Sequence, residues 1–332
     1  MALACFSMGA CGTLGSEPAP PGPLPHNGTG PYRPLEPPET GLFGVEPSCV
    51  LLALGRDVAV DRAMMAAGHL WLGMARLRPD APPLEGPAHD VDWTAFEPRF
   101  IARARSNGAG GFVEPEVVLM PDGDEGYVTD PWMLVHPDGT LRMYYASALG
   151  IRVAESAGPG GPFVRREPAT VAAAENGPLR RPTAVRFGEQ TLLWFESPEG
   201  IRLVRAEDGV RFGPATPLEA GVETDAGLDD ARLESPGATV VHTTAGRSFV
   251  RLFVEARRPE GPVELRLLAT DDGHRYEAYS LPVLDVPDAT APAPLALDAR
   301  RTLLVFRWPR VIDGRWTGAV CGAIAPASAR WP

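Results

Sequence analysis

The stretch from Val128 to Ser147, VTDPWMLVHPDGTLRMYYAS, predicts one β-hairpin. Residues 132–136 form a short apolar run after a proline, and residues 141–146 form a second run rich in aromatic and long apolar side chains. Between them, residues 137–140 (PDGT) have the composition of a turn, whose glycine can adopt a positive φ without steric strain. Asp130 precedes the first strand, so we expect its carboxylate at the strand mouth, where it can face a ligand.

The hairpin is the clearest of five similar units along the chain. GIRVAES, starting at Gly150, and GIRLVRAEDG, starting at Gly200, each follow a hairpin and provide a third strand, and a weaker fourth strand comes next. One such unit cannot bury both of its faces alone. We therefore expect an all-β, five-bladed β-propeller with four-stranded antiparallel blades, and two β-sandwich domains are the structural alternative. The blades are expected to start near Asp61, Asp130, Arg181, Ser235 and Ala291.

Residues 43–328 are expected to form the propeller. The apolar run from Glu46 to Leu54 has no partner in its own unit, and an open edge strand promotes aggregation, so we expect it to pair with the last blade and close the ring. This pairing would bring Cys49 close to Cys321. In an oxidising compartment the two could form a disulfide, and two buried free thiols are the alternative.

The N-terminal residues predict export. Residues 1–11 end in Met8-Gly9-Ala10-Cys11 and resemble a bacterial lipoprotein signal, in which Cys11 would be lipidated. Residues 12–42 are rich in proline and glycine, which indicates an extended tether. We therefore expect an exported protein, either secreted or in the cell envelope, whose membrane contact is a lipid anchor. A disordered cytosolic N-terminus is the alternative.

Composition narrows the range of partners and cofactors. The net charge is −11, which argues against nucleic acid because phosphate binding requires a basic face. All 31 basic residues are arginine. We expect a monomer without a cofactor; a central metal ion is an option whose ligands the sequence does not name. Residues 122–125 (DGDE) resemble a calcium loop loosely, and an acidic surface loop is the better interpretation.

In a propeller the innermost strands line a central funnel, so residues before the first strand and after the second share one rim. Carboxylates and aromatic rings on such a rim suit sugars, whose hydroxyls need hydrogen bonds and whose ring faces stack. The alternative is that each aspartate only caps the turn that enters its strand. Besides the blade starts, the rim should include Glu196, Glu255, Arg257 and Trp308.

The sequence TDPWMLVHPDGTLRMYYAS, followed by GIRVAES, resembles the blade repeat of five-bladed propeller glycoside hydrolases, the arabinanase and β-xylosidase type of family 43 with their invertase-like relatives. The resemblance covers roughly Ala59 to Ala325. It implies that Asp61 is the base or nucleophile and that Asp130 tunes pKa values or steadies the transition state. The position of the general acid in the third blade holds Arg181, which cannot donate a proton near neutral pH.

This departure leaves three interpretations open. Glu196 of the same blade replaces the acid, Glu255 of the fourth blade does so, or the site binds without hydrolysing. We take Asp61, Asp130 and Glu196 as candidate catalytic residues. The candidate substrate-binding residues are Arg181, Trp132, Glu255, Arg257 and Trp308.

The resemblance implies that the central funnel binds carbohydrate or a cell-envelope glycan. It leaves hydrolysis of this ligand open. An inactive propeller that binds a protein or an envelope component is the alternative function. Chemistry unrelated to sugars is a third option that the fold permits.

Overall fold

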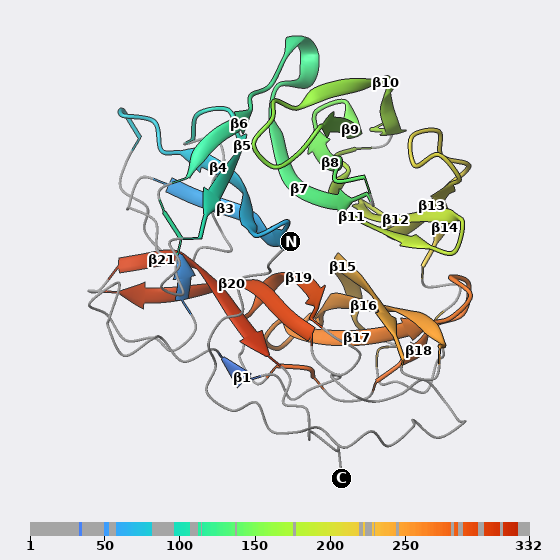
Figure 1. Ribbon diagram of the computed structural model, residues 1–332. Coiled ribbons are helices and arrows are strands. Elements are labelled where there is room, and N and C mark those ends of the chain that lie inside the picture. Colours follow the sequence, from blue (N-terminus) through green and yellow to red (C-terminus); the bar gives the residue numbers. More distant parts are fainter. Residues whose placement is uncertain are drawn as a thin grey trace, which may run out of the picture.

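The computed structural model contains five antiparallel sheets, and the part of the chain that it describes holds no α-helix (Figure 1). Consequently, no helix in this part could cross a membrane. The structure describes residues 33–34, 50–52, 58–81, 96–106, 112–113, 115–136, 138–174, 177–218, 222, 228, 230–243, 246–279, 282–284, 288–297, 302–312 and 315–324.

The sheets are arranged around a common centre as the blades of a five-bladed propeller (Figure 1), which confirms the predicted fold class. Blade one comprises β3 (Val58–Ala66), β4 (His69–Arg76), β5 (Phe100–Arg105) and β6 (Glu116–Leu119). Blade two comprises β7 (Val128–Val135), β8 (Leu141–Ser147), β9 (Gly150–Ser156) and β10 (Val164–Ala173). Blade three comprises β11 (Arg180–Phe187), β12 (Gln190–Ser197), β13 (Gly200–Ala206) and β14 (Thr216–Pro217). Blade four comprises β15 (Arg232–His242), β16 (Ser248–Arg257), β17 (Glu264–Thr270) and β18 (Glu277–Ala278).

Blade five is built from both ends of the chain. It comprises β19 (Thr290–Ala296), β20 (Thr302–Ile312) and β21 (Arg315–Ile324), and β21 pairs antiparallel with β1 (Arg33–Pro34) and β2 (Val50–Leu52). The pairing covers the edge of the last blade with N-terminal strands, which confirms the predicted ring closure.

Cys321 lies at this closure. It is fully buried, it pairs with Val50 in the sheet, and it is disulfide-bonded. Cys49 lies outside the described residues, as does Cys11, so their predicted roles in a disulfide and in lipidation stay predictions.

The middle strands of the blades are buried on both faces because neighbouring blades pack against each other. In β8 six of the seven residues are buried, and Tyr144 and Tyr145 have no exposed surface. Polar atoms of the large core side chains bond across blades: the indole Nε1 of Trp194 donates to the hydroxyl of Tyr276 at 3.0 Å. Each such bond couples the position of one blade to that of the next.

A glycine makes a second coupling between blades. The hydroxyl of Tyr144 in blade two donates to the carbonyl oxygen of Gly209, which follows β13 in blade three, at 2.7 Å. Gly209 has a φ of 67°, and a Cβ there would collide with Arg142 and Tyr144. Glycine is required at this turn because it allows both the left-handed backbone and the close approach.

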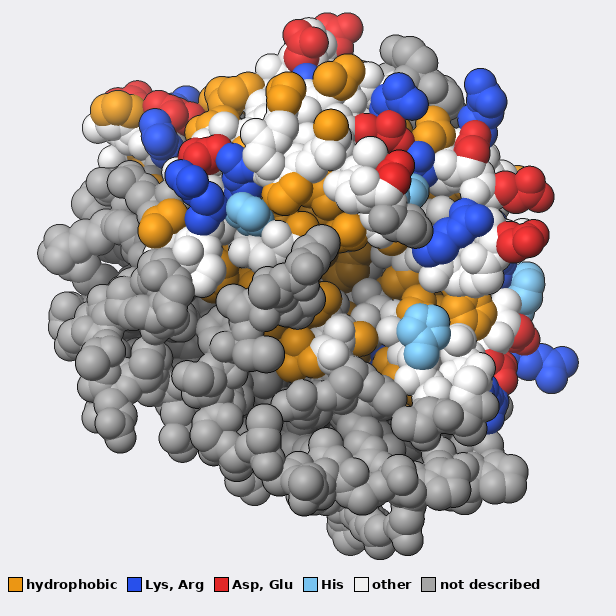
Figure 2. Space-filling view, in the orientation of Figure 1, with side chains coloured by type: hydrophobic (Ala, Val, Ile, Leu, Met, Phe, Trp, Pro, Cys, Tyr) orange, Lys and Arg blue, Asp and Glu red, His pale blue; other side chains and the backbone are white. Residues whose placement is uncertain are grey.

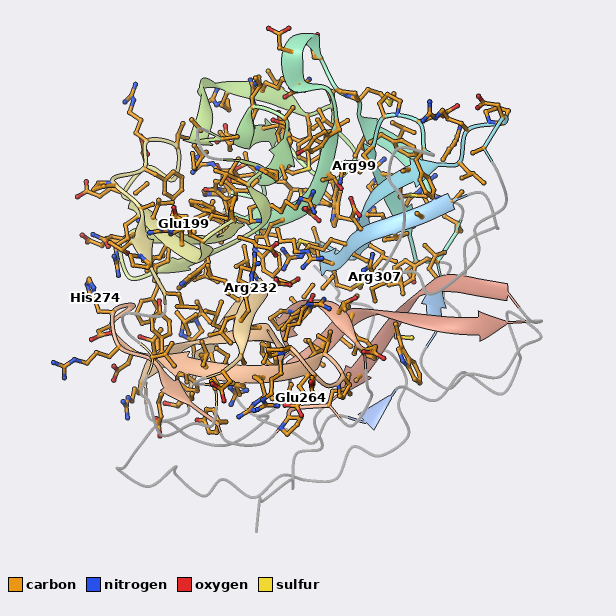
Figure 3. All side chains as sticks on the ribbon, turned by 180° about the vertical axis from the view of Figure 1, so that it is seen from behind. Arg99, Glu199, Arg232, Glu264, His274 and Arg307 are labelled. Atoms are coloured by element: carbon orange, nitrogen blue, oxygen red, sulfur yellow. The ribbon has the colours of Figure 1, made fainter. Side chains whose placement is uncertain are left out.

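The face of the molecule in Figure 2 has hydrophobic side chains around its centre and charged side chains toward its edge. Seen from behind in Figure 3, Arg99, Arg232 and Arg307 lie around the centre, and they come from three different blades. Charged side chains from several blades therefore lie toward the centre of the propeller.

Candidate functional site at the propeller axis

The blade starts lie inside the innermost strands rather than before them, which corrects the sequence interpretation of Asp130. β7 begins at Val128, and its pairing with β8 is interrupted by a β-bulge between Thr129 and Trp132. The same irregularity occurs at every blade start. Four of the five starting residues have a left-handed backbone, with φ of 51° at Asp130, Arg181 and Ser235 and 53° at Ala291.

Each of these four residues is followed by a proline. A left-handed backbone at a residue other than glycine costs about 1–2 kcal/mol, so the surrounding structure must fix it. The bulge turns the starting residue of each blade toward the axis and toward the neighbouring blade. We call the end of the propeller where these bulges lie the funnel end.

Hydrogen bonds at the funnel end link each blade to the next. The backbone N–H of Arg181 donates to Oδ2 of Asp130 at 3.1 Å. In the same way, the N–H of Ser235 donates to Oε2 of Glu196 at 3.2 Å, and the N–H of Ala291 donates to Oε1 of Glu255 at 2.7 Å. These three carboxylates therefore hold the bulges of the following blades in place.

The side chain of Arg181 lies among the carboxylates. Its Nη1 is 3.2 Å from Oε2 of Glu196 and 3.5 Å from Oε1 of Glu255. Burial by itself lowers the pKa of Arg181, but Glu255, Glu196 and the aspartates at the first two blade starts outweigh it, so the pKa lies above its ordinary value. Arg181 is a permanent cation at the position where the resemblance implies an acid.

Asp130 is the carboxyl group whose charged form the site disfavours. Its side chain is only 3% exposed, and burial raises its pKa, as does the nearby charge of Asp61. Arg181 and Arg62 act in the opposite direction without reversing the shift. Asp130 is thus a carboxyl group with a raised pKa that solvent and ligands can scarcely reach.

Asp61 has a different environment. Its Oδ2 accepts a hydrogen bond from Oγ1 of Thr129 at 2.7 Å and forms an ion pair with Nη1 of Arg99 at 3.1 Å. The guanidinium of Arg99 also lies 4.0 Å from the ring centre of Tyr127, within the range of a cation–π contact. The side chain of Asp61 is 12% exposed, so one edge of its carboxylate reaches solvent.

Arg62 fills the axis of the propeller. Its side chain has no exposed surface, and its guanidinium donates to the carbonyl oxygens of Pro182 at 3.0 Å, Pro236 at 2.5 Å and Pro292 at 3.1 Å. Burial lowers the pKa of Arg62 to about 10, against the influence of Asp130. The three carbonyls belong to blades three, four and five, so one side chain from blade one joins all of them.

The central metal ion that the sequence left open does not fit this axis. The carbonyl oxygens that could surround an ion accept hydrogen bonds from the Arg62 guanidinium instead. Within the described residues no group of three histidine, cysteine, aspartate or glutamate side chains could hold a metal ion.

The roles of Arg62, Arg99 and Arg307 were not predicted from the sequence. Arg307 donates to the carbonyl oxygen of Val60 at 3.1 Å and joins blade five to blade one. The one available signal was at the first blade start, where Asp61 is followed by arginine and each of the other starts is followed by proline.

Two predicted ligand contacts need correction. Trp132 is 2% exposed, its Nε1 donates to the carbonyl oxygen of Ala184 at 2.8 Å, and the Arg62 guanidinium lies 4.6 Å from its ring centre. Its ring is part of the core and offers no face to a sugar. Glu255 is fully buried, so it holds Arg181 and the Ala291 backbone rather than contacting a ligand.

The other two predicted contact residues lie toward the outside of the funnel end. Arg257 is an exposed side chain that lies 3.4 Å from Glu234 and 3.8 Å from Glu255. Trp308 is partly buried and packs against the apolar cluster between blades four and five. Of the predicted residues, the structure therefore brings together Asp61, Asp130, Arg181, Glu196 and Glu255 at the axis.

A surface hollow of about 390 Å³ lies elsewhere, beside the outer strands of blade three. Its lining includes Gln190, which begins β12, whereas Glu196 is near the end of that strand. At about 3.3 Å per residue the two positions are about 20 Å apart, so the hollow is separate from the carboxylates.

The chain was compared with known proteins. No protein-family model and no curated protein matches it. Solved structures do match: an α-L-arabinofuranosidase from Clostridium thermocellum is 15% identical with a TM-score of 0.51, and the match covers 80% of this chain and 88% of the other. A glycosyl hydrolase from Bacteroides ovatus is 13% identical with a TM-score of 0.55, covering 90% and 96%.

A fructofuranosidase from Schwanniomyces occidentalis is 14% identical with a TM-score of 0.60, and the match covers 91% of this chain and 60% of the fructofuranosidase. At such low identity these likenesses show the fold. The chain is a five-bladed propeller with the architecture of these glycosidases, as the resemblance implied.

Proposed function

We propose that this propeller binds a saccharide at its funnel end without hydrolysing it. The observation that carries the proposal is the position of Arg181, which occupies the third blade start and forms ion pairs with both Glu196 and Glu255. The two glutamates that could replace the missing acid are the two that hold this arginine.

Hydrolysis of a glycoside usually requires two carboxyl groups, one of which is protonated and reaches the glycosidic oxygen. Asp130 has the raised pKa that such an acid needs, but it is only 3% exposed. Glu196 is 15% exposed, and its Oε2 is engaged by Arg181 and by the Ser235 backbone. The carboxyl group with the raised pKa, Asp130, is therefore one that a ligand can scarcely reach.

Binding of a saccharide, unlike hydrolysis, does not require a protonated carboxyl group that reaches the glycosidic oxygen. Asp61, Glu196, Arg99 and Arg181 are each partly exposed, with side-chain exposures between 12% and 19%. They present alternating acceptors and donors that are fixed by ion pairs, and sugar hydroxyls both donate and accept hydrogen bonds. Pre-organised polar groups of this kind bind without a further loss of side-chain entropy. The likeness in fold to three solved glycosidases supports a sugar as the ligand.

The test pairs a binding measurement with an assay for hydrolysis. The purified chain is titrated against a panel of neutral and acidic oligosaccharides by calorimetry, and each one is then incubated with excess protein and analysed for reducing ends. We expect at least one class to bind and no product to appear. Product that disappears in Asp61→Asn would contradict the proposal and show a hydrolase. A complete lack of binding would also contradict it and would favour a protein-interaction propeller.

A further inference from the structure

Arginines are concentrated on the inner and second strands at the funnel end, although the chain as a whole has a net charge of −11. On the described parts of these strands, seven arginines and five carboxylates lie at this end, while Glu97, Glu199 and Glu264 lie in or beside its turns. The arginines are Arg62, Arg76, Arg180, Arg181, Arg232, Arg257 and Arg307, and the carboxylates are Asp61, Asp130, Glu196, Glu234 and Glu255. The arginines are the groups at this end that can attract an anionic ligand.

Arg181 is the arginine whose geometry suits a ligand. Its Nη1 and its backbone N–H are occupied by Glu196, Glu255 and Asp130. Its Nε and Nη2 have no partner among the described residues, and the side chain is 19% exposed. These two atoms form the flat edge of the guanidinium that binds a carboxylate with two parallel hydrogen bonds.

The carboxylates on the other edge keep Arg181 in place. Glu196 and Glu255 approach the same Nη1, and both carboxylates are themselves bonded to the backbone of the next blade. The orientation of the open edge is therefore set by the blade packing, and a ligand would not have to order it.

A second arginine extends the positive surface from the same carboxylate. Nη2 of Arg257 is 3.8 Å from Oε2 of Glu255, whereas Arg181 approaches Oε1. The Arg257 side chain is 43% exposed, so it stands farther out along the path that a ligand would take. One buried carboxylate thus positions two arginines at different depths.

We propose that the saccharide bound at the funnel end carries a carboxylate, as in a hexuronic acid residue, and that the Nε–Nη2 edge of Arg181 binds it. The inference rests on the proposed function and specifies the class of sugar. Arg257 lies near enough to contribute its charge to an acidic neighbouring unit, and Asp61 and Glu196 accept hydrogen bonds from hydroxyls.

The test compares each acidic sugar with its own neutral ester. Oligomers of galacturonate, glucuronate and mannuronate are titrated by calorimetry beside their methyl esters, which have the same ring and linkage but no charge. At least one acid should bind 10-fold or more tightly than its ester. Arg181→Gln should abolish this preference, and Arg181→Lys should retain only part of it because an ammonium lacks the two-pronged edge.

Arg247→Gln is the matched control because it removes one exposed arginine at the start of β16, at the opposite end of the strand from Arg257. It should leave the preference for the acid unchanged. Urea unfolding of each variant establishes that it is folded.

The outcomes separate this inference from the proposed function. If a neutral sugar binds as tightly as its acid, or if Arg181→Gln keeps the preference, the carboxylate assignment is wrong while binding itself stands. If acids bind preferentially through Arg181 but are cleaved, the assignment holds and the absence of hydrolysis is wrong. If no acid and no ester binds, the carboxylate assignment is wrong, and the proposed function is wrong as well if no other oligosaccharide of the panel binds.

Discussion

Two arginines near the axis, Arg62 and Arg181, occupy opposite electrostatic environments. Arg62 is fully buried, its guanidinium donates to three neutral carbonyl groups, and burial lowers its pKa to about 10. Arg181 lies among four carboxylates that hold its pKa above the ordinary value, and one edge of its guanidinium has no protein partner in the described part of the chain.

The difference shows that arginine serves two purposes in the same ring of blades. A fully buried guanidinium whose two Nη atoms donate to carbonyls of three blades can stabilise the fold but cannot reach a ligand. A guanidinium held by carboxylates on one side is rigid and charged, and it retains donors on the other side. The first is a structural cation, and the second is a binding group.

The largest effect is expected for Arg62→Met. The substitution leaves the carbonyl oxygens of Pro182, Pro236 and Pro292 buried without a donor, and we expect it to reduce the free energy of unfolding by about 3–5 kcal/mol. Urea unfolding at pH 7 measures the change. Arg76→Met, which removes an exposed arginine of β4, is the control and should cost less than about 0.5 kcal/mol. A loss below about 1 kcal/mol for Arg62→Met would show that the carbonyls do not depend on this side chain.

A smaller loss in the free energy of unfolding is expected for Gly237→Ala. Gly237 follows Pro236 on β15, and a Cβ there would collide with the backbone carbonyl of Pro292 in the next blade. Because both partners are backbone atoms close to the axis, we expect a cost of about 1–3 kcal/mol from overpacking. Gly158→Ala, where no heavy atom lies within 4 Å of the new Cβ, is the control. Equal stability of the two variants would mean that the blades can separate at the axis freely.

The smallest effect is expected for Asp130→Asn, and it depends on pH. The pKa of Asp130 is raised in the folded protein, so between the unfolded pKa near 3.8 and the folded value the folded state binds the extra proton. The wild-type protein should therefore gain stability relative to the variant as pH falls through this window. At pH 7 the variant should be equal in stability or more stable by about 1 kcal/mol, because it buries no charge.

Asp138→Asn provides the control of opposite sign. Hydrogen bonds from Thr140 lower the pKa of the exposed Asp138 carboxyl, so its contribution is present above the unfolded pKa and is lost as pH falls. Urea midpoints from pH 3 to pH 7 follow both variants. For each variant, the urea midpoint is compared with that of the wild type as pH falls. If this difference changes in the same direction for Asp130→Asn as for Asp138→Asn, the environment inferred for Asp130 is contradicted.

The blade pattern could be predicted from the sequence because hairpins, turns and strand composition recur locally. Residues 141–146 and Gly139 specify a strand and a turn through their own side chains and backbone, and the structure has both. The internal repeats located the blade starts for the same reason, since the same hairpin pattern follows each one.

The site could be predicted only in part, because its contacts join residues far apart in the sequence. Arg62 meets Pro292 across 230 positions, and no local pattern indicates that a guanidinium reaches the axis. Trp132 appeared suited to a ligand for the opposite reason: its sequence neighbours place it next to Asp130, whereas the bulge at Asp130 and the packing of β11 decide which way its ring faces.

The measurement that tests the division between the two arginines most directly is the shift in the urea midpoint caused by the preferred hexuronate oligomer. It is recorded for the wild-type protein, Arg62→Lys and Arg181→Gln, because binding to the folded state raises the midpoint by an amount that grows with the logarithm of the affinity. We predict that Arg62→Lys has a lower midpoint without ligand and keeps the ligand-induced shift, whereas Arg181→Gln loses the shift. A full shift in Arg181→Gln, or the loss of the shift in Arg62→Lys alone, would contradict the account.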